Sequence, residues 1–201
     1  MAKLKGPLFS LGATQQLGKA LVFFGWKGLD VVREYVIPSN PKTDAQVTQR
    51  GHLTNAVTRV HWAQARSTLP MVAADIAAYA LWASVVQSAT TWFNQAVRGM
   101  IDCLVAGKLY PLFYAGSAVA GANQVVFTIY AHLDAPTSAT IFYGTSKTAL
   151  INSVTATKAG TKFDKTIAGL TTGVKYYFQL RADSGDPAEG ARSGIYYATP
   201  T

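Results

Sequence analysis

The chain is poor in charge and has almost no cysteine or histidine. Only 14% of its 201 residues are charged, with 18 Lys and Arg against 10 Asp and Glu, and it holds one cysteine and three histidines. The single cysteine, Cys103, excludes a disulfide within the chain and favours synthesis in a reducing compartment. So few charges in a 49% hydrophobic chain are typical of a subunit that covers part of its surface with partners, although a compact apolar monomer has a similar composition.

A long hydrophobic run is also missing. The most apolar stretch, residues 71–86, contains Asp75 and is shorter than a bilayer crossing requires. Near the N-terminus, the residues after Lys3 and Lys5 are too few and too polar for the hydrophobic part of a signal peptide. We therefore expect a soluble chain with no membrane partner.

Sequence patterns that carry catalysis are absent. His52, His61 and His132 have no metal-ligand spacing with acids or with Cys103. A nucleophile elbow, a GxGxxG motif and a P-loop are missing as well. We predict a protein that is not an enzyme and that needs no cofactor and no metal.

Three acids cluster near the C-terminus, and they allow two interpretations. Asp183, Asp186 and Glu189 fall between two predicted strands. Carboxylates in one loop would suit a weak calcium site. A polar hairpin loop explains them equally well, and that is what we expect.

Positive charge gathers in the first third of the chain. Residues 1–66 hold nine Lys or Arg and three acids, whereas residues 116–201 hold seven and five. Such an excess would suit nucleic acid or an acidic protein surface as a partner. Because there is no block of consecutive basic residues, we expect a solvated basic face instead.

Two β-rich runs flank a glycine-bearing turn near the N-terminus. Residues 20–24 and 29–37 lie on either side of Gly25-Trp26-Lys27-Gly28, which predicts a hairpin. The second run alternates between two faces, with Val31, Arg33 and Tyr35 on one and Val32, Glu34 and Val36 on the other. Neither face is purely apolar. An isolated hairpin is marginal in water, so we expect this one to pack on helices or on a neighbouring subunit.

Three helical patterns follow. Thr43 and Gln46 fit a capping box, and the helix after them extends to about residue 66. A second pattern over residues 70–85 is apolar nearly all round, which predicts burial on more than one side. The third starts near residue 91, and Gly107 suits the position just after its end.

From residue 116 onward the pattern changes to short strands and frequent turns. Residues 109–122 suit either a linker or a first strand. Six further strands are predicted at residues 124–131, 139–144, 150–155, 162–167, 175–182 and 194–199. We therefore predict an α+β chain, with a β-hairpin and a three-helix unit in residues 1–115 and an all-β sandwich in residues 116–201.

One corner of this β region resembles fibronectin type III domains. Leu170, Gly173 and Tyr176 follow that family's order of a leucine, a turn glycine and a tyrosine. The resemblance implies an immunoglobulin-like sandwich in which the hydroxyl of Tyr176 ties the corner to the backbone. The tryptophan that the family has on its second strand is missing, so Phe127 or Ile129 should fill its space.

The first 115 residues resemble structural proteins of tailed-phage and prophage virions whose role is unassigned. The matching residues are Trp26-Lys27-Gly28, Val31-Val32-Arg33, Pro38, Asn40-Pro41-Lys42-Thr43, Gln46, Gln49-Arg50 and, in a later helix, Trp82. The resemblance implies a homo-oligomeric virion component, such as a capsid or tail decoration protein, made in the host cytoplasm. Its N-terminal region would make the contacts between subunits, and its sandwich would project outward from the particle. As a local structure, the segment from Asn40 to Arg50 suits a rigid joint between hairpin and helix better than a ligand site.

Two other functions remain open. Loops of the sandwich with exposed tyrosines such as Tyr196 and Tyr197 would suit a carbohydrate-binding or cell-surface adhesin. The basic N-terminal third would suit a third function, nucleic-acid packaging, in which binding should weaken steeply with salt. The expected partners are copies of this chain and other virion proteins, with host-surface glycans as the alternative.

Overall fold

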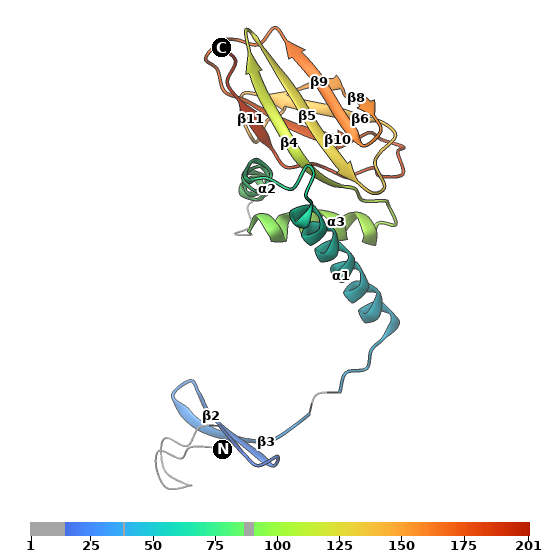
Figure 1. The fold of residues 1–201 in the computed structure, drawn as a ribbon. Helices are drawn as coiled ribbons and strands as arrows, with labels where there is room; N and C mark the ends of the chain where they lie inside the picture. The colour runs from blue at the N-terminus through green and yellow to red at the C-terminus, as the bar shows by residue number, and fades with distance from the viewer. Residues whose placement is uncertain (1–14, 38, 87–90) are drawn as a thin grey trace. The chain divides into compact units, whose positions relative to one another are not determined.

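The structure is a computed structural model that describes residues 15–37, 39–86 and 91–201. Contacts within the chain divide it into two compact units, residues 1–43 and residues 44–201. The described residues form three helices and three antiparallel sheets (Figure 1). The predicted α+β class is therefore confirmed.

The first unit contains a three-stranded antiparallel sheet. Its strands are β1 (Gln15–Leu17), β2 (Leu21–Trp26) and β3 (Leu29–Glu34), in the order β1-β2-β3. β2 and β3 form the predicted hairpin, but its turn is tighter than predicted, because Trp26 pairs with Leu29. Only Lys27 and Gly28 lie between them, both with positive φ of 49° and 81°. That backbone is typical of a type I′ turn, which matches the twist of the two strands.

Three helices begin the second unit: α1 (Asp44–Ala65), α2 (Ala73–Val85) and α3 (Trp92–Val105). α1 starts directly after Thr43, as predicted. α2 starts three residues later than predicted, since the Asp75 carboxylate accepts a hydrogen bond from the Val72 N–H at 2.8 Å and so caps the helix there. Thr91 caps α3, and Gly107, with φ 69°, follows its end as predicted.

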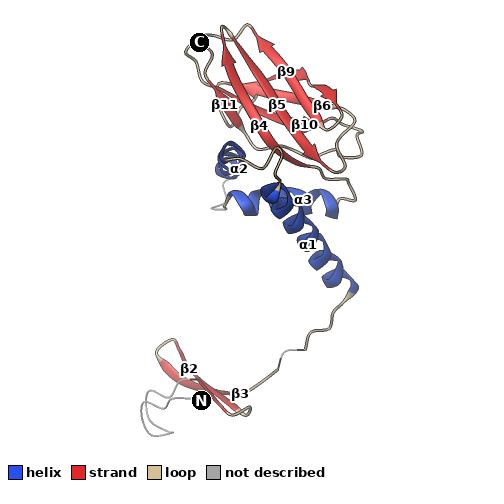
Figure 2. Cartoon of the chain, in the orientation of Figure 1, coloured by secondary structure: helices blue, strands red, loops and turns tan. Residues whose placement is uncertain are grey.

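The remaining strands form two four-stranded antiparallel sheets, in the orders β4-β5-β9-β8 and β11-β10-β6-β7 (Figure 2). Their bounds are β4 (Leu112–Gly121), β5 (Gln124–His132), β6 (Ala139–Gly144), β7 (Asn152–Thr155), β8 (Thr157–Ala159), β9 (Lys162–Ala168), β10 (Tyr176–Ala182) and β11 (Tyr196–Ala198). All six predicted strands are present, and β4 shows that the segment before them is a strand. β8 was missed because it has three residues, all exposed, and no apolar alternation.

The two sheets share one core. Phe127 of β5 and Phe178 of β10 are fully buried, with ring centroids 6.0 Å apart. Ile129 is fully buried as well, so both residues proposed to replace a tryptophan lie in the core.

The helices belong to the same compact unit as the sheets. α2 contacts α3 on one side and β4 and β11 on another, and α1 also contacts β4. The predicted boundary between residues 115 and 116 falls inside β4, whereas the contacts divide the chain after Thr43. Helices and sandwich therefore form one body, and Pro38 of the predicted joint lies outside the described residues.

Candidate functional site

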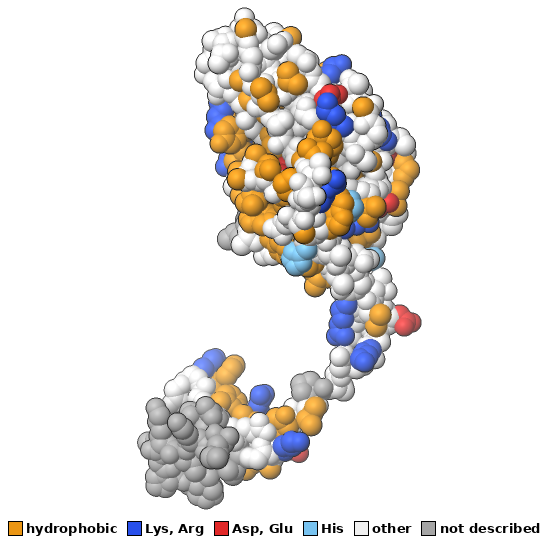
Figure 3. Space-filling view, viewed as in Figure 1, with side chains coloured by type: hydrophobic (Ala, Val, Ile, Leu, Met, Phe, Trp, Pro, Cys, Tyr) orange, Lys and Arg blue, Asp and Glu red, His pale blue; other side chains and the backbone are white. Residues whose placement is uncertain are grey.

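The candidate assembly surface is the sheet of the first unit. None of the described side chains of β2 and β3 is buried. Four large apolar side chains are more than a third exposed: Leu21 (38%), Trp26 (59%), Leu29 (68%) and Val32 (49%). Figure 3 shows hydrophobic side chains on the surface of this unit. A small sheet without a covered apolar face is marginally stable in water.

The register of the hairpin gives this sheet two distinct faces. Side chains opposite one another in an antiparallel pair share a face, and successive residues alternate. The register therefore assigns face A the residues Val22, Phe24, Trp26, Leu29, Val31 and Arg33. It assigns face B the residues Leu21, Phe23, Val32 and Glu34. On face A the Arg33 guanidinium lies 5.3 Å from the centre of the Phe24 ring, a favourable cation–π contact.

The predicted joint between hairpin and helix is exposed. Asn40, Pro41 and Thr43 lie in irregular backbone before α1, and Gln46 and Arg50 lie on its first two turns. Every residue from 41 to 51 is exposed, whereas Ala56, Val60 and Ala63 further along α1 are fully buried. The start of α1 thus extends beyond the core of the second unit.

A buried carboxylate joins α2 to the sheets, and the sequence analysis missed it. Asp75 is fully buried and accepts four hydrogen bonds. Its donors are Val72 N (2.8 Å), Ala115 N (2.9 Å), Gly116 N (2.8 Å) and the Tyr196 hydroxyl (2.6 Å). Burial raises the pKa of Asp75, and the four hydrogen bonds oppose that rise. Because each carboxylate oxygen has two donors, the group serves as a structural link rather than as a reactive acid.

The backbone around this link is shaped to bring the elements close. β4 has a bulge between Tyr114 and Ser117, with Ala115 at φ 48°, and the bulge turns two N–H groups toward Asp75. A Cβ on Gly116 would lie 2.3 Å from the Tyr196 ring, and a Cβ on Gly194 would lie 2.7 Å from Ala78 of α2. Glycine is therefore required where β4 meets Tyr196 of β11 and where the chain before β11 meets α2.

A second joint holds α1 on the sheets through cations and aromatic rings. The Trp62 and His132 rings are stacked, with centroids 3.3 Å apart, and the Arg66 guanidinium lies 4.6 Å from the Trp62 ring. Arg59 pairs with Asp134 at 2.9 Å. Burial lowers the pKa of His132, and the positive charges of the two arginines lower it further. The lowered pKa favours the uncharged form of His132 beside the two arginines.

Trp82, named by the virion resemblance, is a packing residue of α2. Its ring centroid lies 6.2 Å from that of Tyr79, and a Cβ on Gly99 of α3 would lie 3.1 Å from it. It packs α2 against α3. Cys103, also on α3, is buried, and burial raises the pKa of its thiol, as expected of a small core residue.

The corner between β9 and β10 contains Leu170, Gly173 and Tyr176, the three residues that carry the fibronectin resemblance. Leu170 is buried, and Gly173 has φ 76°, which favours glycine. The hydroxyl oxygen of Tyr176 accepts a hydrogen bond from the Thr171 N–H at 3.2 Å, and this bond lowers the pKa of Tyr176. The tyrosine thus ties the corner to the backbone.

The tyrosines proposed as sugar-stacking residues differ from what was expected. Tyr196 is 4% exposed and faces inward, where its hydroxyl binds Asp75, so the prediction that it is exposed was wrong. Tyr197 is 53% exposed, but the Lys175 ammonium lies 3.7 Å from the centre of its ring. Alternation in β11 sends neighbouring side chains to opposite faces, so the two tyrosines cannot form one platform.

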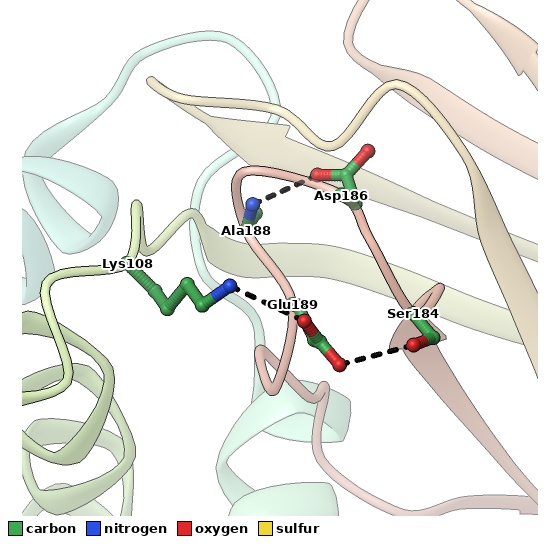
Figure 4. Close-up of polar contacts among 5 residues, drawn as sticks. All are labelled: Lys108, Ser184, Asp186, Ala188 and Glu189. Atoms are coloured by element: carbon green, nitrogen blue, oxygen red, sulfur yellow. Dashed lines mark hydrogen bonds and ion pairs between the residues drawn. The ribbon is translucent and has the colours of Figure 1, made fainter.

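The three acids before β11 tie their loop to neighbouring segments, and Figure 4 shows two of them, Asp186 and Glu189. Asp186 accepts hydrogen bonds from the N–H groups of Thr137 (2.7 Å) and Ala188 (2.8 Å), and Glu189 pairs with Lys108 at 3.2 Å. Burial pushes the pKa of Asp186 upward, but these hydrogen bonds outweigh it and hold the pKa below its usual value. The acids fix the shape of the loop, as expected for a hairpin loop.

Within residues 15–37, 39–86 and 91–201, no three His, Cys, Asp or Glu side chains are grouped closely enough to hold a metal ion. Over the same residues, no helix is long and apolar enough to cross a membrane.

An apolar groove of about 440 Å³ runs beside α2, lined among others by Ala74, Ala77, Ser117 and Ile195.

The chain matches no protein-family model, no curated protein and no solved structure. A proposal for its function therefore rests on its own sequence and structure.

Proposed function

We propose that this chain is a non-enzymatic structural subunit that associates with copies of itself through the sheet of its first unit. One observation carries the proposal: β2 and β3 present large apolar side chains, and none of the described ones is buried. Removing apolar surface from water yields about 25 cal/mol per Å², so such a sheet gains stability chiefly by meeting another apolar surface.

The proposed place of this subunit is a virion, as a capsid or tail decoration or assembly component. Its support is the sequence resemblance carried by Trp26, Arg33, Asn40, Thr43 and Arg50. The exposed position of these residues is compatible with contacts to other proteins. Partners would be further copies and other virion proteins.

The displayed part is proposed to be a fibronectin type III-like sandwich. Two features support this assignment. The sheet orders β4-β5-β9-β8 and β11-β10-β6-β7 correspond to strands A-B-E-D and G-F-C-C′ of immunoglobulin-like folds. Tyr176 also makes the corner hydrogen bond at the start of the proposed strand F.

The alternative, a glycan-binding adhesin, has less support. Tyr196 is buried, and the ring of Tyr197 is partly covered by Lys175. A glycan array probed with the full chain tests this alternative directly. Binding that disappears in Tyr197→Ala would favour the adhesin.

Sedimentation velocity of the full chain over a wide concentration range tests the proposal. We expect self-association that increases with concentration. Mass spectrometry of purified phage particles should then detect this chain as a stoichiometric component. A chain that stays monomeric at high concentration and is absent from particles would refute both parts.

A further inference from the structure

The sheet of the first unit carries apolar side chains on both of its faces. Face A has Phe24, Trp26 and Leu29, and face B has Leu21, Phe23 and Val32. An antiparallel sheet commonly covers one apolar face and leaves a polar face in water. Here both faces need a cover. A single partner surface, whether another part of the same chain or one two-fold related copy, covers only one of them.

The two faces also differ in charge. Arg33 lies on face A beside Phe24, whereas Glu34 lies on face B, opposite Leu21 in the register. Stacked sheets lie about 10 Å apart, so charges on facing surfaces interact. Stacking face A on face B brings unlike charges together. Stacking a face on its own kind brings together like charges, which repel.

We infer that copies of this chain stack head to tail, with face A of one sheet packed on face B of the next. The inference rests on the proposed self-association and specifies its geometry. Such a contact is heterologous, because two different surfaces meet, and it closes into a ring or extends as a filament. Every internal copy then has both apolar faces covered, which a two-fold dimer cannot achieve.

Two double variants of the full chain separate the faces. Trp26→Thr with Leu29→Thr changes face A, and Leu21→Thr with Val32→Thr changes face B. These four side chains are more than a third exposed, and threonine favours strands, so the hairpin should persist. A matched control, Trp26→Phe with Leu29→Ile, keeps face A apolar.

Mass photometry and sedimentation velocity provide the measurement. Wild-type chain should form assemblies larger than a dimer, and the control should match it. Each double variant alone should be monomeric, with association weakened at least about tenfold. An equimolar mixture of the two variants should form a heterodimer and stop there, since each variant supplies the one intact face that the other lacks.

Several outcomes overturn the inference. A double variant that forms stable dimers alone shows that like faces meet, which leaves self-association intact but excludes head-to-tail stacking. A wild-type chain that stops at a dimer, a mixture that stays monomeric, or a control that fails to assemble also counts against it. A wild-type chain that is monomeric at all concentrations removes the proposed function as well, and points to a cover supplied within the chain.

Discussion

The two units of the chain use similar strand patterns with opposite results. In the second unit Phe127, Phe163 and Phe178 are fully buried, whereas none of the described side chains of β2 and β3 is buried. The described residues of the second unit form two sheets and three helices that pack together, whereas those of the first unit form one sheet. A strand pattern therefore identifies an apolar face, and only a covering layer turns that face into a core.

The same contrast appears along α1. Its first turns, up to residue 51, are exposed, but Ala56, Val60 and Ala63 are fully buried against the rest of the second unit. A short helix without tertiary packing is marginal in water. We therefore expect the exposed start of α1, like the sheet of the first unit, to gain stability from contacts with other copies of the chain.

Removing the Asp75 link should have the largest effect on the second unit. Asp75→Ala leaves buried donors of Ala115, Gly116 and Tyr196 without their acceptor. We expect a loss of about 3–5 kcal/mol in the free energy of unfolding, measured by urea denaturation. Asp102→Ala is the control, because its carboxylate is exposed, and it should cost less than about 0.5 kcal/mol. Equal effects in both variants would contradict a structural role for Asp75.

Two glycines should respond in opposite directions to alanine. Gly116→Ala places a Cβ 2.3 Å from the Tyr196 ring and should cost about 1–3 kcal/mol through overpacking. Gly51 lies on the exposed part of α1, where an added Cβ would meet no atom within 4 Å, so Gly51→Ala should stabilise by about 0.5–1 kcal/mol. Thermal unfolding of the two variants measures both changes: the melting temperature should fall for Gly116→Ala and rise for Gly51→Ala. A neutral Gly116→Ala would show that the Tyr196 ring can move away from β4.

The loop held by Asp186 should produce a dependence on pH. The pKa of Asp186 is lowered in the folded chain, so its contribution is present above the unfolded pKa of about 3.9 and is lost as pH falls through the folded pKa. Asp186→Asn should cost about 1–2 kcal/mol at neutral pH and flatten the acid side of the stability curve. Urea midpoints from neutral to acid pH measure this. A variant that keeps the wild-type acid slope would exclude Asp186 as its source.

The corner tyrosine should have a smaller effect. Tyr176→Phe removes the acceptor for the Thr171 N–H in a partly exposed position, so we expect a small loss in the free energy of unfolding. Tyr197→Phe is the matched control, since Tyr197 is 53% exposed, and it should change little. Chemical denaturation of both variants checks the difference, and no difference would argue against a stabilising corner.

Changes to the first unit should have the smallest effect on the second. Trp26→Thr with Leu29→Thr should alter its free energy of unfolding by less than about 0.5 kcal/mol, because both residues belong to the other compact unit and substitutions in independent units usually have independent effects. Hydrogen exchange of amides in residues 44–201, measured at a concentration where the chain is monomeric, tests this. A loss of protection across that unit would mean that the two units depend on each other.

Sequence patterns predicted much of the local structure of this chain. The hairpin, the start of α1 after Thr43, the end of α3 before Gly107 and all six predicted strands are present. Asp75 was treated only as an interruption of an apolar stretch. A lone acid in such a stretch is itself a signal of a buried, hydrogen-bonded group, since an unpaired carboxylate there would be costly.

The sequence by itself determined which segments become helices and most of the strands, because caps, turns and alternation act between residues a few positions apart. It also placed Tyr176 at a corner, five residues from the N–H that it binds. Only the tertiary structure decided that the helices join the sheets in one body, and that Tyr196 faces inward. Those outcomes depend on a hydrogen bond between residues 121 positions apart, and a periodic pattern specifies an apolar face without specifying what covers it.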